Sequence, residues 1–146
     1  MNFKKLIALL ITVPVSLAGC VGIGPNATYY MGATSFHYDL SYNAYMVELN
    51  GKEIGGGFGG GTNVAPIKVG QQIITWKDSH TGELHTAKNV VVITKGQLKG
   101  KKYLAAHLYP DDSVEITTSN NLPDPTEKGL AWMEKQRSQG VKRGGK

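Results

Sequence analysis

The chain has 146 residues and a formal net charge of +5 at pH 7. This length suffices for one domain and not for two. The single cysteine excludes an internal disulfide. Much of the positive charge lies in a glycine-punctuated loop at 95–102 and in the C-terminal tail. A nucleic-acid-binding face needs basic residues interleaved with aromatic ones, so we expect no nucleic-acid partner.

The N-terminus has the order of a secretory signal. Lys4 and Lys5 precede an apolar run from Leu6 to Leu17, which is shorter than the roughly 20 apolar residues needed to span a bilayer. The run leads into Leu-Ala-Gly-Cys, which ends at Cys20 and resembles the lipobox of bacterial lipoproteins. This resemblance implies that Cys20 is lipidated and becomes the first mature residue. A plain signal peptide, or a buried apolar helix that ends in cysteine, is the alternative.

Lipidation of Cys20 would anchor the domain to a membrane, because several acyl chains on one residue bury many methylene groups. Residue 21 is Val and not Asp, which by resemblance to enterobacterial lipoproteins favours the outer membrane, facing the periplasm. Removing residues 1–19 takes 2 lysines from the 16 basic residues, so 14 remain against 11 acids and the mature charge is +3. The predicted organisation is a signal peptide at 1–19, a lipidated cysteine and tether at 20–28, one β-rich domain with a C-terminal helix at 29–140, and a disordered tail at 141–146.

Short segments that alternate apolar and polar residues, or that are rich in β-branched and aromatic residues, run through the whole domain. Their spacing, with no helix between them, predicts a mainly β fold: an antiparallel β-sandwich or a partly open barrel with one C-terminal helix. The expected strands are 29–36, 36–40, 44–49, 52–54, 67–69, 71–76, 86–94, 103–109 and 114–117.

Two of these strands carry sharper expectations. In the strand at 44–49, alternation places Tyr45 and Leu49 on one face. Asn50-Gly51 follows as a type I′ turn, because both central positions of that turn need a positive φ. Val90–Ile93 is apolar on both faces, so we expect it to be a central strand of a sheet.

A cluster of glycines follows this turn. Seven of the 19 glycines of the chain lie between Gly51 and Gly61, and ordering glycine costs more entropy than ordering any other residue. We interpret 55–61 as a mobile loop that crosses to the next strand. It is not a phosphate loop, because a nucleotide fingerprint needs a helix directly after the glycines and Pro66 blocks one. Phe58 stands between two glycine triplets and is either presented outward as an anchor or folded back into the core.

The C-terminal helix has a clear start signal. The sequence Asp-Pro-Thr-Glu at 124–127 places Asp124 as N-cap, proline at the first helical position and an acid to complete the cap. Leu130 and Met133 supply an apolar stripe, and Gly140 is a suitable stop. This helix would cover one end or one face of the sheet.

The sequence has no convincing catalytic or metal-binding constellation. It lacks a Gly-x-Ser-x-Gly elbow, and adjacency of Asp78, Ser79 and His80 does not give triad geometry. His80 and His85 flank a turn and could hold zinc together with Asp78 or Glu83, but nothing fixes a third ligand. We therefore predict no enzymatic activity, no metal, no cofactor and no small-molecule substrate.

Five side chains are candidates for contact with a protein partner, because loops on a rigid scaffold carry function and aromatic or charged anchors supply most binding energy. Asp111 and Asp112 follow a proline in a turn. They are either an acidic knob that enters a basic pocket of a partner or plain solvated acids. The candidates are Phe58, His80, Tyr109, Asp111 and Asp112.

Several motifs in order resemble one family. Tyr38-Asp39-Leu40, the strand ending in Asn50-Gly51, the glycine cluster, and Ile74-Thr75-Trp76 look like small bacterial lipoproteins catalogued as the domain of unknown function 3304. The resemblance covers about 34–134. Members often carry cysteines just after the glycines, where this chain has Asn63-Val64-Ala65, so a disulfide-locked loop is not expected. Some such lipoproteins resemble immunity partners of type VI secretion phospholipase effectors.

Two hypotheses of function follow. The first is a periplasmic, membrane-anchored immunity protein that binds and blocks a type VI secretion phospholipase-type effector, as the resemblance implies. The second is an envelope structural or assembly lipoprotein that docks onto another envelope protein through a sheet edge or an apolar patch.

Overall fold

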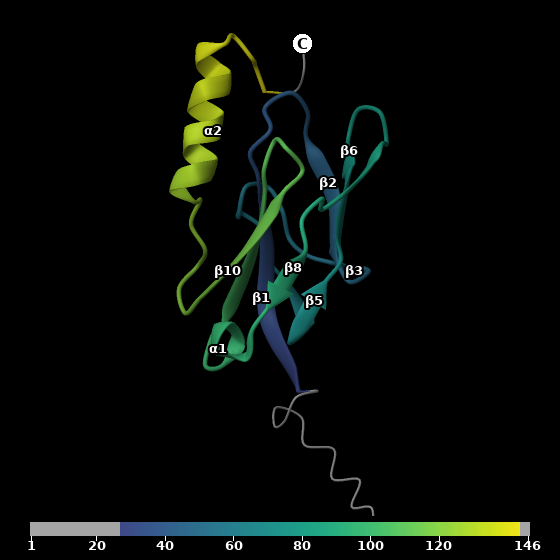
Figure 1. Ribbon diagram of the computed structural model, residues 1–146, viewed down its shortest axis with the longest axis vertical. Coiled ribbons are helices and arrows are strands. Elements are labelled where there is room, and N and C mark those ends of the chain that lie inside the picture. The colour runs from purple at the N-terminus through teal and green to yellow at the C-terminus, as the bar shows by residue number, and fades with distance from the viewer. Residues whose placement is uncertain (1–26, 144–146) are drawn as a thin grey trace, which may run out of the picture.

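The computed structural model describes residues 27–143. The signal segment, Cys20, most of the tether and the last three residues lie outside the described residues. Within 27–143 the chain is mainly β, with two four-stranded sheets, a two-stranded ribbon and one long C-terminal helix (Figure 1). The fold is consistent with the predicted β-sandwich. In this range no helix is both long and apolar enough to cross a membrane.

The first sheet has the strand order β10-β9-β1-β4, the second β3-β2-β6-β7, and β5 pairs with β8. The first sheet contains β1 (Thr28–His37), β4 (Asn63–Lys68), β9 (Tyr103–Leu108) and β10 (Val114–Ser119). The second sheet contains β2 (Ala44–Leu49), β3 (Lys52–Glu53), β6 (Ile74–Asp78) and β7 (Leu84–Thr86). The ribbon consists of β5 (Gly70–Gln72) and β8 (Val91–Ile93), and the helices are α1 (Lys95–Leu98) and α2 (Glu127–Ser138).

The strand pairs are antiparallel apart from β1 and β9, which run parallel. The first sheet is therefore mixed, a feature that short-range sequence patterns do not reveal. A parallel pair needs a long crossover connection. Here the whole second sheet, the ribbon and α1 lie in the sequence between β1 and β9.

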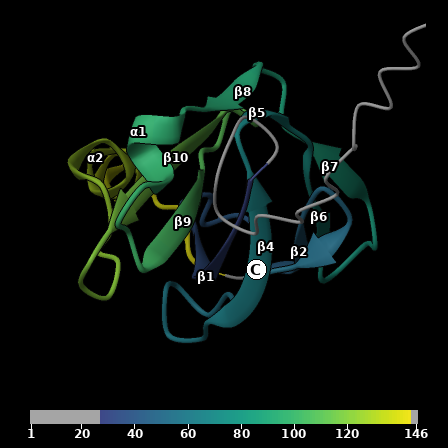
Figure 2. The ribbon, with the colours of Figure 1, turned by 90° about the horizontal axis from the view of Figure 1, so that it is seen from below.

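The main core lies between the two sheets. Alternate residues of β1, β4 and β9 face it, because successive side chains of a strand point to opposite faces. Trp76 and Ile74 from β6 meet Leu104 and Leu108 from β9 there, all without solvent exposure. Figure 2 shows the resulting layers, with α2 on one side of the first sheet and β2, β6 and β7 on the other.

A second, smaller core fills the space between α2 and the outer face of the first sheet. It contains Phe36, Tyr38, Ala105 and Tyr109 from the sheet side and Met133 from the helix. The rings of Tyr38 and Tyr109 are stacked with centroids 5.4 Å apart. The predicted helix therefore covers one face of a sheet and not its end.

The start of α2 differs from the prediction. The N-cap is Thr126 and not Asp124, and Thr126 Oγ1 accepts a hydrogen bond from the amide of Gly129 at 3.0 Å. The amide of Thr126 donates to the hydroxyl of Tyr38 at 2.9 Å. A long-range contact with the sheet thus selects the cap. Leu130, expected in the apolar stripe, is largely exposed.

Gly129 lies where α2 approaches the sheet closely, and a larger residue would not fit there, because a Cβ would lie 2.2 Å from the ring of Tyr38. At the other end of α2, Gly140 has a φ of 81° and ends the helix as predicted. Beyond it, Val141 packs against the second core. The predicted disorder from 141 therefore does not describe Val141.

Two further expectations are wrong. Val90–Ile93 is not a central strand: β8 pairs with β5 alone, and Val90 and Val92 are exposed. The loop at 95–102 begins with one helical turn, α1, which Thr94 and Gln97 close with a capping box. That box has the Ser/Thr-x-x-Glu/Gln spacing and was readable in the sequence.

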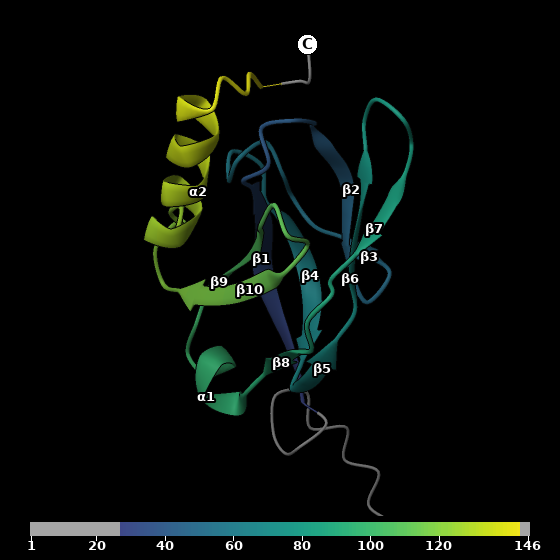
Figure 3. The ribbon, with the colours of Figure 1, turned by 45° about the horizontal axis from the view of Figure 1, so that its top comes forward.

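The long axis of the domain has two distinct ends (Figures 1 and 3). The proximal end contains Thr28 at the start of β1, the β5–β8 ribbon and α1. The distal end contains the loops 38–43, 79–83 and 109–113, together with the C-terminal part of α2.

Candidate functional site

The glycine-rich loop is ordered along β1. The amide of Gly55 donates to the carbonyl of Ala33 at 2.9 Å, and that of Gly59 to Ser35 at 3.0 Å. The hydroxyl of Ser35 donates to the carbonyl of Gly55 at 2.7 Å. These bonds contradict our interpretation of the segment as a mobile loop. The backbone runs so close to its neighbours that a Cβ on Gly55 would lie 1.9 Å from the carbonyl oxygen of Gly61.

Phe58 folds back into the second core. Its ring meets Phe36 edge-on at a centroid distance of 5.1 Å and Tyr38 at 5.6 Å. Of the two alternatives for Phe58, the structure therefore shows the core role. The glycines explain how: a Cβ on Gly59 would lie 2.3 Å from the ring of Phe36, so only glycine lets the loop approach this closely.

A cleft of about 350 Å³ opens between this loop and β2. A second hollow of about 420 Å³ continues along the same strand, and the two share Ala44, Val47, Gly56 and Gly57. Besides these four, the first cleft is lined by Ser35, His37, Asn43, Phe58 and Arg143. The guanidinium of Arg143 lies 5.7 Å from the centroid of the Phe58 ring. We name this combined groove the distal cleft.

His37 is the most unusual group of the distal cleft. Burial lowers the pKa of its imidazole to about 4, and the nearby Arg143 acts in the same direction, whereas Asp39 opposes both. His37 is therefore neutral at pH 7. Its Nε2 is buried and has no hydrogen-bond partner among the described residues. The same is true of Nε2 of His85, and such atoms usually have a hydrogen-bond partner in a native protein.

A cluster around Tyr42 adjoins His37. The two rings lie 4.4 Å apart, and the ring of His85 stacks on Tyr42 at 5.0 Å and on Trp76 at 5.5 Å. The indole of Trp76 donates to the hydroxyl of Tyr42 at 2.8 Å. Burial raises the pKa of Tyr42 to about 12, so the phenol stays protonated and the cluster is held by neutral hydrogen bonds and stacking.

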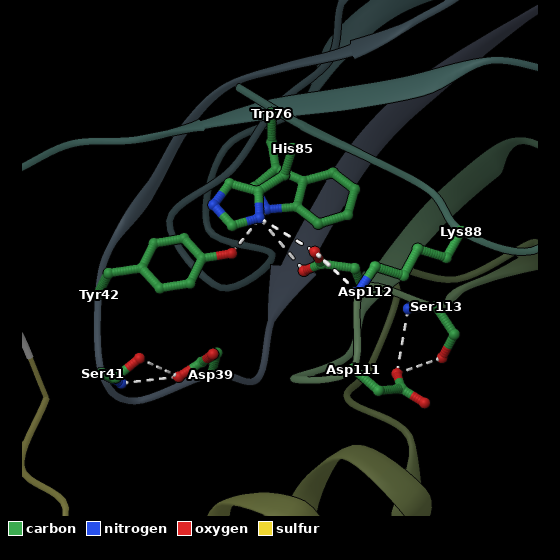
Figure 4. A network of polar contacts seen from close by, with 9 residues as sticks. All are labelled: Asp39, Ser41, Tyr42, Trp76, His85, Lys88, Asp111, Asp112 and Ser113. Atoms are coloured by element: carbon green, nitrogen blue, oxygen red, sulfur yellow. Dashed lines mark hydrogen bonds and ion pairs between the residues drawn. The ribbon is translucent and has the colours of Figure 1, made fainter. Parts of the chain in front are cut away.

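Asp112 joins this cluster to the β9–β10 turn (Figure 4). Its carboxylate oxygens lie 3.2 Å from Nδ1 of His85, and one of them lies 3.9 Å from Nζ of Lys88. Asp112 itself has a φ of 62°, which orients the carboxylate toward the sheet. The acid predicted as a knob for a partner is thus engaged in an internal ion pair on one side.

The remaining candidates lie apart from the distal cleft. Tyr109 is buried under α2, and its hydroxyl forms hydrogen bonds with Glu115 and Thr126. This differs from our prediction that Tyr109 is an anchor on the surface. Asp111 is exposed but accepts two hydrogen bonds from Ser113, which lower its pKa. His80 is exposed in the hairpin turn, and its amide donates to Asp78.

His80 and His85, which the sequence allowed as a possible pair of metal ligands, do not come together with other metal-type ligands among residues 27–143. His85 turns instead to Asp112, and no group of three or more metal-type ligands exists among residues 27–143. The carboxylate behind His85 resembles the orienting acid of a catalytic histidine. In the distal loops, the hydroxyls of Ser41 and Ser113 donate to Asp39 and Asp111.

Sequence reasoning missed His37, Tyr42 and Arg143 as members of one site. They come from the end of β1, the following loop and the residues after α2, so no spacing pattern relates them. The usable signal was the Tyr42-Asn43 turn directly after His37, which keeps both rings near the same sheet end.

Comparisons with protein-family models, with curated proteins and with solved structures give no match to this chain. The resemblance to the domain of unknown function 3304 stays a prediction that rests on the motifs alone.

Proposed function

We propose that this chain is a lipid-anchored protein of the periplasmic face of the outer membrane that binds and blocks a phospholipase-type effector of type VI secretion. The observation that best supports a binding role is the distal cleft, whose first part is lined by Asn43 and by His37, the last residue of β1, which begins at Thr28. Cys20 would attach to the membrane through its lipid, and the cleft would face the periplasm.

The distal cleft suits an acidic group from a partner. Among residues 27–143, Arg143 is the one charged residue that lines its first part, and the neutral imidazole of His37 also lines it. The guanidinium can grip a carboxylate through two parallel hydrogen bonds. Around these groups the walls are glycine backbone, Val47 and the Phe58 ring, which exclude water from the contact.

The second part of the distal cleft supplies apolar anchors. Tyr45 and Met46 are each 41% exposed on its rim. A bulge in β2 causes this, since the register with β6 shifts between Tyr45 and Glu48 and Met46 has a φ of 48°. Alternation predicts Tyr45 on the same face as Leu49, which is buried, and the bulge is the reason for the difference. Exposed aromatic and methionine side chains beside a preformed groove are typical of interface cores.

His80, Asp111 and Asp112 would act at the rim of this interface. Exposed rim charges mainly change association rates and salt dependence and contribute less to final affinity. Phe58 would support the cleft floor, and Tyr109 would act only through the packing of α2.

The test measures binding of the purified mature chain to a phospholipase-type effector encoded beside it, and survival of cells exposed to that effector. Arg143→Glu is expected to weaken binding at least tenfold, because it would place a like charge opposite the partner's acid. Met46→Asn keeps a residue that tolerates positive φ while removing the apolar side chain, and a loss of several-fold is expected. Lys142→Glu makes the same charge change beside the cleft and is the control.

The proposal is rejected if the mature chain binds no such effector, or if cells without it survive the effector. Equal losses of effector binding in Arg143→Glu and Lys142→Glu would show an effect of net charge alone. The distal cleft would then not be the binding site.

A second function is favoured by a separate surface. Tyr30 and Val64 are 66% and 69% exposed on the outer face of the first sheet, where Tyr30 pairs across strands with Pro66. An envelope protein could dock there, as expected for a structural or assembly lipoprotein. Tyr30→Ser with Val64→Thr would abolish capture of such a partner and leave effector binding unchanged.

A further inference from the structure

Acidic side chains are unevenly distributed along the long axis of the domain, whereas basic ones occur at both ends. The sequence has no Asp or Glu in 54–77 or in 84–110, and these stretches supply the proximal ribbon, α1 and the start of β9. The distal loops carry acids instead. Five lysines belong to the proximal end: Lys68, Lys95, Lys99, Lys101 and Lys102. The acids of the distal loops and of the C-terminal part of α2 are Asp39, Asp78, Glu83, Asp111, Asp112 and Glu134.

The fold gathers the proximal lysines around the beginning of β1. Lys68 is the cross-strand partner of Thr28. The carbonyl of Lys102 accepts a hydrogen bond from the amide of Gly32 at 3.0 Å. Lys95 starts α1, which Figures 1 and 3 place at the same end. All five lysines are exposed, and none forms an ion pair within residues 27–143.

Apolar side chains lie beside these lysines. Ile73 directly follows β5 and is 61% exposed, and Val92 lies in β8 and is 54% exposed. A basic surface with exposed aliphatic residues combines the two attractions that hold proteins on lipid surfaces, namely electrostatic attraction to anionic headgroups and burial of apolar area.

We propose that the proximal end docks on the surface of an anionic lipid bilayer. This inference uses the lipid anchor of the proposed function. Six residues separate Cys20 from Ala27, and the chain between these two positions spans at most about 25 Å. An anchored Cys20 therefore keeps Thr28 and the surrounding lysines close to the headgroups. Electrostatic attraction acts within about 10 Å at 0.1 M salt, a distance from the headgroups that the tether allows the lysines to reach.

Docking would set the orientation of the domain. With the lysines against the bilayer, the long axis points away from the membrane, and the distal cleft is presented to the periplasm.

The test uses residues 20–146 with Cys20→Ser, a chain that has no acyl group and keeps every described residue. Co-sedimentation is measured with vesicles of phosphatidylcholine, with and without phosphatidylglycerol. We expect binding only to the phosphatidylglycerol vesicles, and its loss at high salt. Lys99→Glu/Lys101→Glu/Lys102→Glu is expected to lower the partition coefficient at least about tenfold, since each lysine near an anionic surface contributes about fivefold. The control, Lys77→Glu/Lys135→Glu/Lys142→Glu, makes the same change in net charge elsewhere and should retain most of the binding.

Equal losses in the two triple variants would overturn the proposal, as would equal binding to both kinds of vesicle or to neither. Capture of an acidic protein without vesicle binding would also overturn it. The assay contains no effector, so its failure leaves the inhibitory function standing, and a failure of effector binding leaves this surface untouched. Circular dichroism of both triple variants shows whether each is folded.

Discussion

Two histidines of this domain, the half-buried His37 and the buried His107, have pKa values shifted in the same direction but differ in their hydrogen bonds. Burial lowers the pKa of both His37 and His107 to about 4. His107 uses both ring nitrogens: Nδ1 lies 2.8 Å from the Tyr38 hydroxyl, and Nε2 lies 2.7 Å from Thr117 Oγ1. His37 leaves Nε2 without a partner in the described chain. His37 and His107 therefore share the direction of their pKa shift and differ in whether both ring nitrogens have a partner within the described chain.

The surroundings of His107 also define its tautomer. The Tyr38 hydroxyl accepts a hydrogen bond from the Thr126 amide, so its own proton is available for Nδ1 of His107. His107 then carries its proton on Nε2 and donates it to Thr117. This chain of bonds joins β1, β9, β10 and the cap of α2, which is why we regard His107 as structural.

Lowering the pH should have the largest effect on the free energy of unfolding, because it protonates both His37 and His107. In the unfolded chain both histidines take up a proton near pH 6.5, whereas in the folded chain they do so only near pH 4. Between these values the unfolded state binds more protons, so stability falls as pH drops from 6.5 to 4. We expect each histidine to contribute a loss of about 2 to 3 kcal/mol. Urea unfolding across this pH range measures the total.

Single replacements then assign that loss to the two histidines. His37→Gln and His107→Gln should each remove about half of the histidine-dependent slope. A slope that is unchanged in both variants would show that other groups, such as Asp39 or Glu115, cause the pH dependence.

At pH 7 the two histidines should differ sharply. His107→Leu removes the acceptor of Tyr38 and the donor to Thr117 and should cost about 3 kcal/mol, because buried polar groups lose their partners. His37→Leu removes an unpaired polar atom and should change the unfolding free energy by less than about 1 kcal/mol. Equal costs for the two variants would contradict the distinction.

A substitution at Gly129 tests the packing around Tyr38, the hydrogen-bond partner of His107, and should have a smaller effect on stability. Gly129→Ala places a Cβ 2.2 Å from the Tyr38 ring and should cost about 2 kcal/mol through overpacking. Gly96→Ala, in α1, meets no atom closer than 3.9 Å and is the matched control. Thermal unfolding should show a lowered midpoint for the first variant alone.

Local patterns predicted the parts of the fold that depend on neighbours in sequence. Asn50-Gly51 forms the expected turn, with φ values of 51° and 79°, because the requirement for positive φ lies within the two residues themselves. The mainly β fold and the C-terminal helix follow from periodicity in the same way. The end of α2 at Gly140 likewise depends only on residues that are close together in the sequence.

The parts that depend on distant contacts were not predictable in this way. Thr126 becomes the helix cap because Tyr38, 88 positions away, accepts its amide proton. Asp112 and His85 meet across 27 positions, and the glycine loop is ordered by the backbone of β1. The distal cleft combines three such separated segments. Candidate residues chosen for exposure in loops therefore included the buried Tyr109 and omitted His37.

Hydrogen–deuterium exchange of the mature chain, measured with and without a phospholipase-type effector, shows whether the distal cleft binds the partner. We expect slower exchange in β2 and in the glycine-rich loop when the effector is present, with no change at the β5–β8 ribbon or α1. Protection confined to the Tyr30 and Val64 face or to the proximal lysines, with β2 and the glycine-rich loop unchanged, would contradict it.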